Sequence, residues 1–180
     1  MHPIIYDVAV SIDGYISGLG GDVSGFAHEG AVVDDYLARL KGYHCALIGR
    51  ASYEFGYGFG LKPGMNPYPH MRSIVVSTTL ELPKQSAVEL WRSLEPQDIA
   101  DLKQNVQGPI YLCGGGQLAA KLLAFEQIDI LRLKRAPIIL GGGTRLFASD
   151  ALPAQGMTLQ SEKSYGDGTL FQEFHLKQPA

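Results

Sequence analysis

The sequence predicts an α/β fold, a three-layer α/β/α sandwich built around a mixed, mostly parallel sheet. Short apolar runs of strand length alternate with segments of helical periodicity along the chain, which is the pattern of strands joined by crossover helices. The C-terminal segment has instead the pattern of a hairpin, which adds antiparallel strands. The 180 residues contain no evident linker or repeat, so we expect a single domain over residues 1–180.

The first half of the chain contains three predicted strands and two predicted helices. Apolar and β-branched runs define the strands, and an apolar stripe at helical spacing defines the longer helix. Two loops, 14–30 with six glycines and 56–70 rich in Gly, Pro and Tyr, are long enough to be functional. The elements, in order, are a strand over 4–10, a helix with the stripe Val33, Tyr36, Leu37 and Leu40, a strand over 44–48, a short helix opening at Gly49, and a strand over 73–77.

The second half continues the alternation. Pro96 suits the first position of a helix, and apolar residues follow it at helical spacing. The remaining predicted elements are a strand over 109–113, a helix over 116–125, one or two strands within 128–139, and a hairpin over 155–176 that turns at 165–168.

Charge and composition exclude several classes of function. A net charge of −3 argues against nucleic acid as a partner, because such proteins usually have a basic face. The chain has neither a leader-like start nor an apolar run near the roughly 18 residues of a membrane span, so we expect a cytoplasmic protein. Cys45 and Cys113 lie in apolar runs and are predicted to be free thiols. The histidines have no metal-ligand spacing, so no metal is expected.

The strongest local signal is a strand that runs through Gly114, Gly115 and Gly116 directly into a helix. Exposed backbone N–H groups at a helix start attract anions, and glycine lets a pyrophosphate approach the main chain. A tight turn without a ligand explains the glycines equally well at this stage. The turn is not the Rossmann fingerprint, because Ala119 stands where that motif needs a third glycine.

Two further strands end in groups that suit an anion. The first leads into Gly49, Arg50 and Ser52, where a guanidinium can hold a phosphate through two hydrogen bonds; the alternative is a surface arginine. The second ends in Ser77 and Thr78, whose hydroxyls suit phosphate oxygens or a simple turn. Ligands of open α/β sheets bind at the carboxyl ends of strands. Three such ends together favour a large nucleotide.

Taken in order, five motifs resemble the dihydrofolate reductase-like superfamily. They are residues 11–16, 48–54, 76–78, 114–116 and 137–147. The branch they are most similar to contains the C-terminal reductase domain of RibD, the bacterial riboflavin-biosynthesis enzyme. The resemblance implies an NADPH-dependent reductase of a small heterocycle, either pterin-like or ribosylaminopyrimidinone-like. Because RibD-like members are commonly dimers, it also implies a homodimer.

The resemblance also assigns the cofactor contacts. Arg50 together with Ser77 or Thr78 would meet the 2′-phosphate, and Ala9 and Ile16 would flank the nicotinamide, with the loop 17–22. The residues implied at the other phosphates are Gly49, Arg50, Ala51 and Ser52, and those implied around the pyrophosphate are Gly114, Gly115, Gly116, Gln117 and Leu118.

The source of the proton is less well defined by the sequence. Folate-reducing relatives use a carboxylate on the first helix, and helical spacing of about 100° per residue puts Asp34 beside the apolar stripe and Asp35 behind it. We therefore expect Asp34 to be catalytic, although a solvated acid explains it equally well, and Asp13 is a further candidate in an Asp-Gly turn. The loop 14–30 contains no tryptophan, unlike that of folate reductases. This difference motivates an alternative, a non-catalytic nucleotide-binding dimer.

Other side chains near these loops leave the substrate open. An aromatic group could stack on a flat heterocycle, although clustered aromatics more often belong to a core or an interface. A phosphorylated substrate would need cations, for which Lys62, Arg72 and Arg145 are candidates. The aromatic group comprises Tyr53, Phe55, Tyr57, Phe59 and Tyr68.

Overall fold

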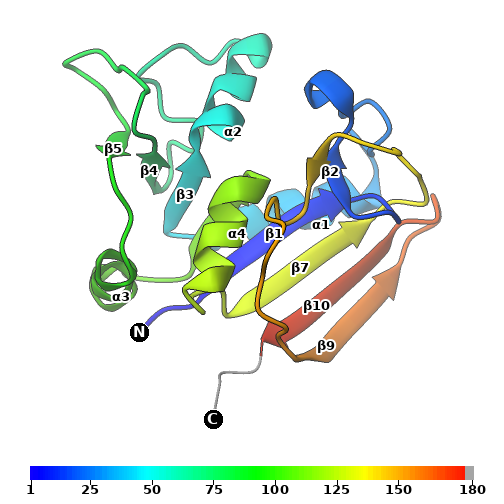
Figure 1. Ribbon diagram of the computed structural model, residues 1–180. Coiled ribbons are helices and arrows are strands. Elements are labelled where there is room, and N and C mark those ends of the chain that lie inside the picture. The colour runs from blue at the N-terminus through cyan, green and yellow to red at the C-terminus, as the bar shows by residue number, and fades with distance from the viewer. Residues whose placement is uncertain (177–180) are drawn as a thin grey trace.

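One eight-stranded sheet organises the protein (Figure 1). The computed structural model describes residues 1–176, and its strands lie in the order β5-β4-β3-β6-β1-β7-β10-β9. The six strands from β5 to β7 are parallel, and β10 pairs antiparallel with both β7 and β9. The predicted mixed, mostly parallel sheet is therefore confirmed. Its strands are β1 (Ile4–Val10), β3 (Cys45–Gly49), β4 (Arg72–Val76), β5 (Glu89–Trp91), β6 (Ile110–Gly114), β7 (Ile130–Arg135), β9 (Met157–Ser164) and β10 (Leu170–Leu176).

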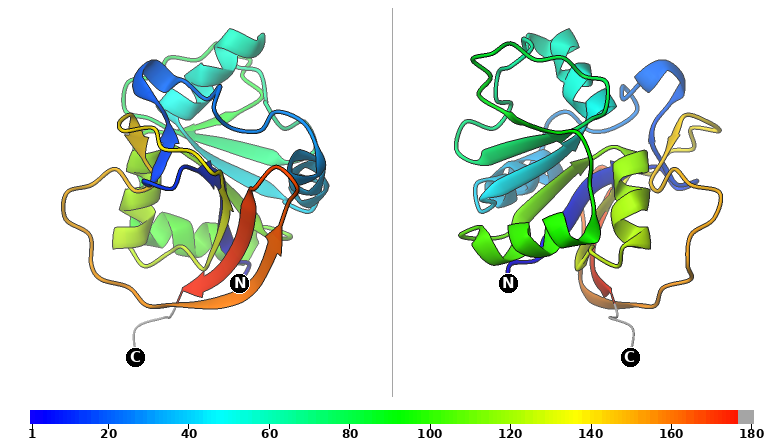
Figure 2. Two further views of the ribbon diagram at one scale, coloured as in Figure 1. Left: turned by 90° about the vertical axis from the view of Figure 1, so that its right-hand side faces the viewer. Right: turned by 60° about the vertical axis from the view of Figure 1, so that its left-hand side comes forward.

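Helices cover both faces of the sheet and complete three layers. The helices are α1 (Ala31–Leu40), α2 (Arg50–Phe55), α3 (Pro96–Asn105) and α4 (Gly116–Ala124). Figures 1 and 2 show α3 and α4 on one face and α1 on the other. Successive strand residues point to opposite faces, so Ile4 and Tyr6 pack in the cluster beneath α3 and α4. Ile5 packs in the second cluster, with α1 and α2.

The start of α3 and the turn of the C-terminal hairpin lie where the sequence predicts them, and local hydrogen bonds fix both. The Asp98 carboxylate accepts a hydrogen bond from the Glu95 N–H at 2.8 Å, which caps α3 ahead of Pro96. In the C-terminal hairpin the Tyr165 N–H donates to the Thr169 carbonyl at 2.9 Å, and Gly168 has a φ of 84°. That conformation favours glycine. The predicted hairpin and its turn are confirmed.

Three short strands were not predicted from the sequence. They are β5, β2 (Tyr15–Ser17) and β8 (Thr144–Arg145). With two or three residues each they are too short for a periodic pattern, and pairing with a neighbour defines them. The segment 128–139 contributes one strand, β7. The predicted loops also begin or contain short 3₁₀ turns, at Leu19–Gly21 and Gly56–Phe59.

The small β2–β8 sheet pairs two segments that lie far apart in the sequence. Asp13 accepts hydrogen bonds from the N–H groups of Leu140 and Gly141 at 3.1 and 2.7 Å, and from the Ser11 hydroxyl at 2.6 Å. The Gly14 N–H donates to the Ser11 carbonyl, so Asp13 lies in a turn. We call this joined unit, residues 11–18 and 138–145, the clasp.

The cysteines and the helices concern two predictions made from composition. Both cysteines are free, with Cys45 buried in β3 and Cys113 partly buried in β6, as predicted. Within residues 1–176, no helix is both long enough and apolar enough to cross a bilayer.

Candidate functional site

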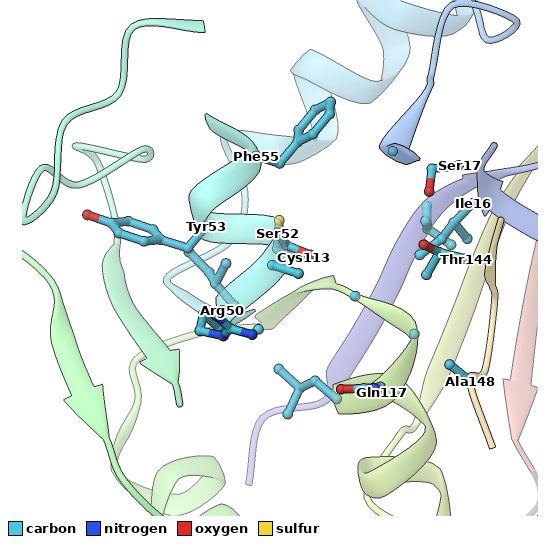
Figure 3. A pocket seen from close by; sticks show the side chains of 18 of the residues that line it. Ile16, Ser17, Arg50, Ser52, Tyr53, Phe55, Cys113, Gln117, Thr144 and Ala148 are labelled. Atoms are coloured by element: carbon cyan, nitrogen blue, oxygen red, sulfur yellow. The ribbon is translucent and has the colours of Figure 1, made fainter. Parts of the chain in front are cut away.

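A cleft of about 970 Å³ opens where β3 and β6 end. Figure 3 shows Arg50, Ser52 and Cys113 on one side of it and Ile16 and Thr144 of the clasp on the other. Its size lies within the range of sites for large ligands. Nine of the residues expected at the cofactor line it: Ile16, Gly49, Arg50, Ala51, Ser52, Gly115, Gly116, Gln117 and Leu118.

Glycine is needed at the base of this cleft because backbones approach closely there. A Cβ at Gly49 would lie 3.1 Å from the Gly115 nitrogen and 3.2 Å from the Gly114 oxygen. A Cβ at Gly116 would lie only 2.2 Å from the Arg145 carbonyl oxygen. The strand ends of β3 and β6 therefore meet with bare main chain. The glycines thus allow the close packing that sets the floor of the cleft.

The N-terminus of α4 adds hydrogen-bond donors to that floor. Helical hydrogen bonding begins at Ala119, whose N–H donates to the Gly115 carbonyl at 3.0 Å. The N–H groups of Gly116, Gln117 and Leu118 precede this bond, and all three residues line the cleft. Such N–H groups at a helix start, reinforced by the helix dipole, suit an anion.

Arg50 is the cation at the mouth of the cleft that the sequence predicts. Its side chain is 53% exposed and, among the described residues, forms a long ion pair with Glu54, at 3.5 Å. An exposed pair of this kind contributes little to stability. The guanidinium is therefore available to a ligand in the cleft.

Four of the residues expected at the cofactor, Ala9, Ser77, Thr78 and Gly114, do not line the large cleft, and neither does Asp34, the expected catalytic residue. The Ser77 hydroxyl instead accepts hydrogen bonds from the N–H groups of Thr79 and Leu80, which is a local turn. Arg92 holds the same turn through the carbonyls of Thr78 and Leu80. The end of β4 is thus tied up in its own turn, and two predicted strand ends, not three, reach the cleft. Gly114, at a φ of 111°, makes the turn between β6 and α4.

A second, smaller cavity of about 350 Å³ adjoins the cleft. Val8 and Cys113 line both spaces, so the two meet at the middle of the sheet. Ala9 lines the small cavity. Its other apolar lining comes from the loop before α1, from α1 itself and from the residue that follows β7: Phe26, Ala27, Val32, Val33 and Ala136.

A buried ion pair, Asp7 with Lys134, lies in this small cavity. Asp7 is 1% exposed and accepts from Lys134 Nζ at 2.5 Å, from Arg39 Nε at 3.0 Å and from the Tyr43 hydroxyl at 3.1 Å. Burial alone would raise the pKa of Asp7, but Lys134 and Arg39 outweigh it and the pKa is lowered. Burial lowers the pKa of Lys134, and Asp7 opposes that shift.

Neutral hydroxyls and a thiol lie at and beside the small cavity. The hydroxyls of Tyr36 and Tyr111 lie 2.8 Å apart, and the Tyr68 hydroxyl lies 3.2 Å from the Cys113 sulfur. Burial raises the pKa of Tyr36, of Tyr111 and of Cys113. These groups therefore stay protonated at neutral pH, and they can donate or accept hydrogen bonds without adding charge.

The face of α1 that lines the small cavity carries Val32, Val33 and Tyr36. Asp34 is exposed and lines neither space, because a helical turn of about 100° per residue carries it away from that face. Asp35 accepts from Lys163 at 2.6 Å and from the Tyr165 hydroxyl at 2.7 Å. Among the described residues, no carboxylate of α1 lines the cavity, so Asp34, predicted beside the apolar stripe, does not reach it.

Sequence reasoning missed Asp7 and Lys134. A signal existed, because Asp7 is a lone carboxylate inside the apolar run of β1, and buried charges are rare unless paired. Of the predicted aromatic group, Tyr53, Phe55 and Tyr68 line the large cleft.

The cations suggested for a phosphorylated substrate separate in the structure. Arg145 lines the large cleft, with a long contact to Asp150 at 3.8 Å. Arg72 is instead held by Glu89 through two hydrogen bonds of 2.6 and 2.8 Å. Lys62 is exposed and lines neither space.

The sheet order, the cleft at its strand ends and the glycine turn define a dihydrofolate reductase-like fold. A dihydrofolate reductase from Enterococcus faecalis, complexed with NADP(H), superposes with a TM-score of 0.66 at 17% identity, over 98% of this chain and 97% of that one. The chain belongs to the RibD C-terminal domain family, whose sequence model matches residues 3–171.

Two further relatives cover nearly the whole chain. A Shewanella sp. PV-4 protein whose name links it to riboflavin biosynthesis superposes with a TM-score of 0.81 at 23% identity, over 99% of this chain and all (100%) of that one. The uncharacterized protein YyaP of Bacillus subtilis is 24% identical over 188 residues, which span 96% of this chain and 94% of YyaP.

Proposed function

We propose that the protein is an NADPH-dependent reductase of a small heterocyclic molecule, pterin-like or ribosylaminopyrimidinone-like. The observation that carries the proposal is the pairing of two spaces that meet at Val8 and Cys113. The larger has the size and anion-friendly lining that a dinucleotide needs, and the smaller has the size of a site for one flat ring system. Hydride transfer requires both reactants to meet in one protected place.

The residues of the large cleft fit the cofactor. NADPH would supply the hydride when bound. Gly49 and Gly116, where a Cβ would meet backbone atoms of neighbouring segments, allow the close packing that holds the start of α4 at the cleft, where its N–H groups can meet phosphates. Gln117 and Leu118 extend this contact, while Ile16 of the clasp lies on the opposite side of the cleft.

Preference for NADPH over NADH rests on Arg50 in this proposal. The side chain lines the cleft, is 53% exposed and forms a long ion pair with Glu54 at 3.5 Å, so it can meet a 2′-phosphate. The Ser77 hydroxyl, which the sequence suggested for the same task, accepts from N–H groups of its own turn, and the Thr78 carbonyl accepts from Arg92. We therefore expect Arg50, and not the end of β4, at the 2′-phosphate.

Fluorescence titration with NADPH and NADH tests the cofactor assignment without a substrate. We expect the protein to bind NADPH at least about tenfold more tightly than NADH, and Arg50→Ala to lose about tenfold in NADPH affinity, because a charge-assisted contact is removed. Arg135→Ala is the matched control, since Arg135 is exposed on β7 and lines neither space. Equal affinity for the two cofactors would contradict the role of Arg50.

One observation favours a second candidate, a nucleotide-binding dimer without catalysis. Among the described residues, α1 offers no carboxylate to the small cavity, whereas folate-reducing relatives place one there. Oxidation of NADPH, followed by its absorbance against pterins, pyrimidinones and quinonoid compounds, separates the two. Turnover of any of these supports the reductase, and tight NADPH binding without turnover across the panel supports the binding protein.

We also propose an assembly and a cellular compartment for the protein. We expect a homodimer that works in the cytoplasm on a small molecule. The free thiols of Cys45 and Cys113 agree with a reducing compartment. Light scattering of the purified protein measures the mass of the assembly, and a monomer at micromolar concentration would contradict the dimer.

A further inference from the structure

We infer that Lys134, held in place by Asp7, is the group by which the small cavity recognises its ligand. The ligand would be a flat heterocycle that presents a hydrogen-bond acceptor, a carbonyl oxygen or an ionised ring nitrogen, and not a pair of amino donors. This inference rests on the proposed function, which makes the small cavity the substrate site. It is carried by charge, by hydrogen-bonding capacity and by shape.

The charged groups around the cavity do not cancel one another. Asp7 is negative, and two cations, Lys134 and Arg39, contact it. The next pair outward, Arg132 with Glu173 at 2.6 Å, is neutral as a whole. The buried group therefore carries one positive charge in excess. A ligand that brings negative charge or an acceptor atom would compensate it.

Asp7 and Lys134 differ in their capacity to form a hydrogen bond with a ligand. Both Asp7 oxygens are occupied, Oδ1 by Lys134 and Arg39 and Oδ2 by Arg39 and Tyr43. The carboxylate is thus unavailable to a pair of ligand donors. An ammonium has three N–H groups, and Lys134 gives one to Asp7 and directs its charge at the Tyr36 ring, 4.1 Å from the centroid.

Lys134 lines the cavity, so the N–H groups that it does not give to Asp7 can donate to a ligand there. Of the described lining residues, it is the one lysine or arginine. Tyr36 and Tyr111 line the same cavity with neutral hydroxyls, since burial raises the pKa of each. Cys113 lines it with a neutral thiol, because burial raises its pKa as well. His28, from the loop before α1, is an exposed lining residue. Lys134 is therefore the buried charge that a ligand meets.

The walls of the small cavity are mostly apolar, and its volume is limited. Small apolar side chains, Val8 and Ala9 from β1 and Ala136 just after β7, line the space together with Tyr36. A volume of about 350 Å³ suits one or two fused rings and little more. Apolar walls with one buried cation fix both the plane of a ring system and the position of its acceptor atom.

Two matched probes test this preference. Lumazine, a pteridine-2,4-dione, presents carbonyl oxygens and an ionisable ring N–H, and 2,4-diaminopteridine presents amino donors on the same ring system. We expect the wild-type protein to bind lumazine at least about tenfold more tightly than the diamino compound. Lys134→Met should abolish that preference, and Lys134→Arg should keep most of it. Arg135→Met, an exposed neighbour on β7, is the control and should behave as wild type.

The spectrum of bound lumazine gives a readout that a purely structural role would not move. Because a nearby cation favours the anionic form, bound lumazine should ionise at lower pH than free lumazine. Lys134→Met should raise that pH, whereas Asp7→Asn, which removes the opposing negative charge, should lower it further. Opposite shifts in the two variants identify Lys134 as the recognition residue and Asp7 as the positioning residue.

The outcomes are separable from those of the proposed function. NADPH titration and circular dichroism accompany each variant and report on the cleft and the fold. A wild-type protein that binds NADPH but binds the two pteridines equally, or does not bind lumazine, overturns the inference and leaves the reductase proposal standing. The same holds if Lys134→Met keeps the lumazine preference. If NADPH does not bind while the lumazine preference and the opposite shifts appear, the reductase proposal fails and the recognition by Lys134 stands.

Discussion

The large cleft and the small cavity meet at Val8 and Cys113, yet they are built by different means. Close backbone packing at glycines sets the floor of the cleft, and its charged lining residues, Arg50 and Arg145 among them, are exposed. A buried ion pair between Asp7 and Lys134 defines the small cavity. The cleft therefore depends on where the backbone runs, whereas the cavity depends on compensation between charges, and substitutions should affect the two in different ways.

The largest expected effect is on stability, from the charges of the small cavity. Asp7→Ala should lower the free energy of unfolding by about 3–5 kcal/mol, because it leaves Lys134 buried without its partner. Urea denaturation measures the change, and Asp34→Ala, at an exposed site, should stay within about 0.5 kcal/mol of wild type. A loss below about 1 kcal/mol for Asp7→Ala would mean that the cavity is not organised by this ion pair.

A smaller loss of stability, with loss of ligand, is expected from the floor of the cleft. Gly116→Ala places a Cβ 2.2 Å from the Arg145 carbonyl oxygen, and overpacking of this kind costs about 1–3 kcal/mol. NADPH affinity should fall with it, because the α4 start must shift. Gly166→Ala is the control, since no atom lies within 4 Å of a Cβ there. Unchanged NADPH affinity in Gly116→Ala would show that the cleft floor does not hold the cofactor.

The smallest expected effect is the response of the ion pair to acid. The pKa of Asp7 is lowered in the folded protein, because Lys134 and Arg39 outweigh the opposing effect of burial. Its carboxylate therefore stabilises the fold above the unfolded pKa of about 3.9, and this contribution is lost as pH falls through the folded value. The difference in unfolding free energy between wild type and Asp7→Asn should shrink from pH 7 to pH 3. A difference that stays constant would contradict the lowered pKa.

The same contrast explains how much the sequence could predict. Long periodic elements, such as β1, α3 and the β9–β10 hairpin, follow from local pattern, whereas β2, β5 and β8 depend on pairing with a distant strand. Gly49, Arg50 and the turn at Gly115 and Gly116 were found because glycine next to a strand end is a local signal, and the structure brings them together in the cleft.

The charges of the small cavity leave no such local signal as a pair. Asp7 and Lys134 are 127 positions apart, and the parallel pairing of β1 with β7 brings them together. Ser77 resembled a ligand group in sequence, but the direction of the chain after β4 turned its hydroxyl to its own backbone. For Asp34, one position along a helix separates the cavity face from the solvent face.

The clasp has a consequence for how ligands enter and leave. Asp13 ties the N-terminal rim to Leu140 and Gly141, and β2 pairs with β8, so neither segment can swing outward alone. Admission of a cofactor to the cleft would be a concerted displacement of both segments. Amide protons of residues 15–17 and 144–145 should then exchange with solvent at rates that slow together when the cleft is filled.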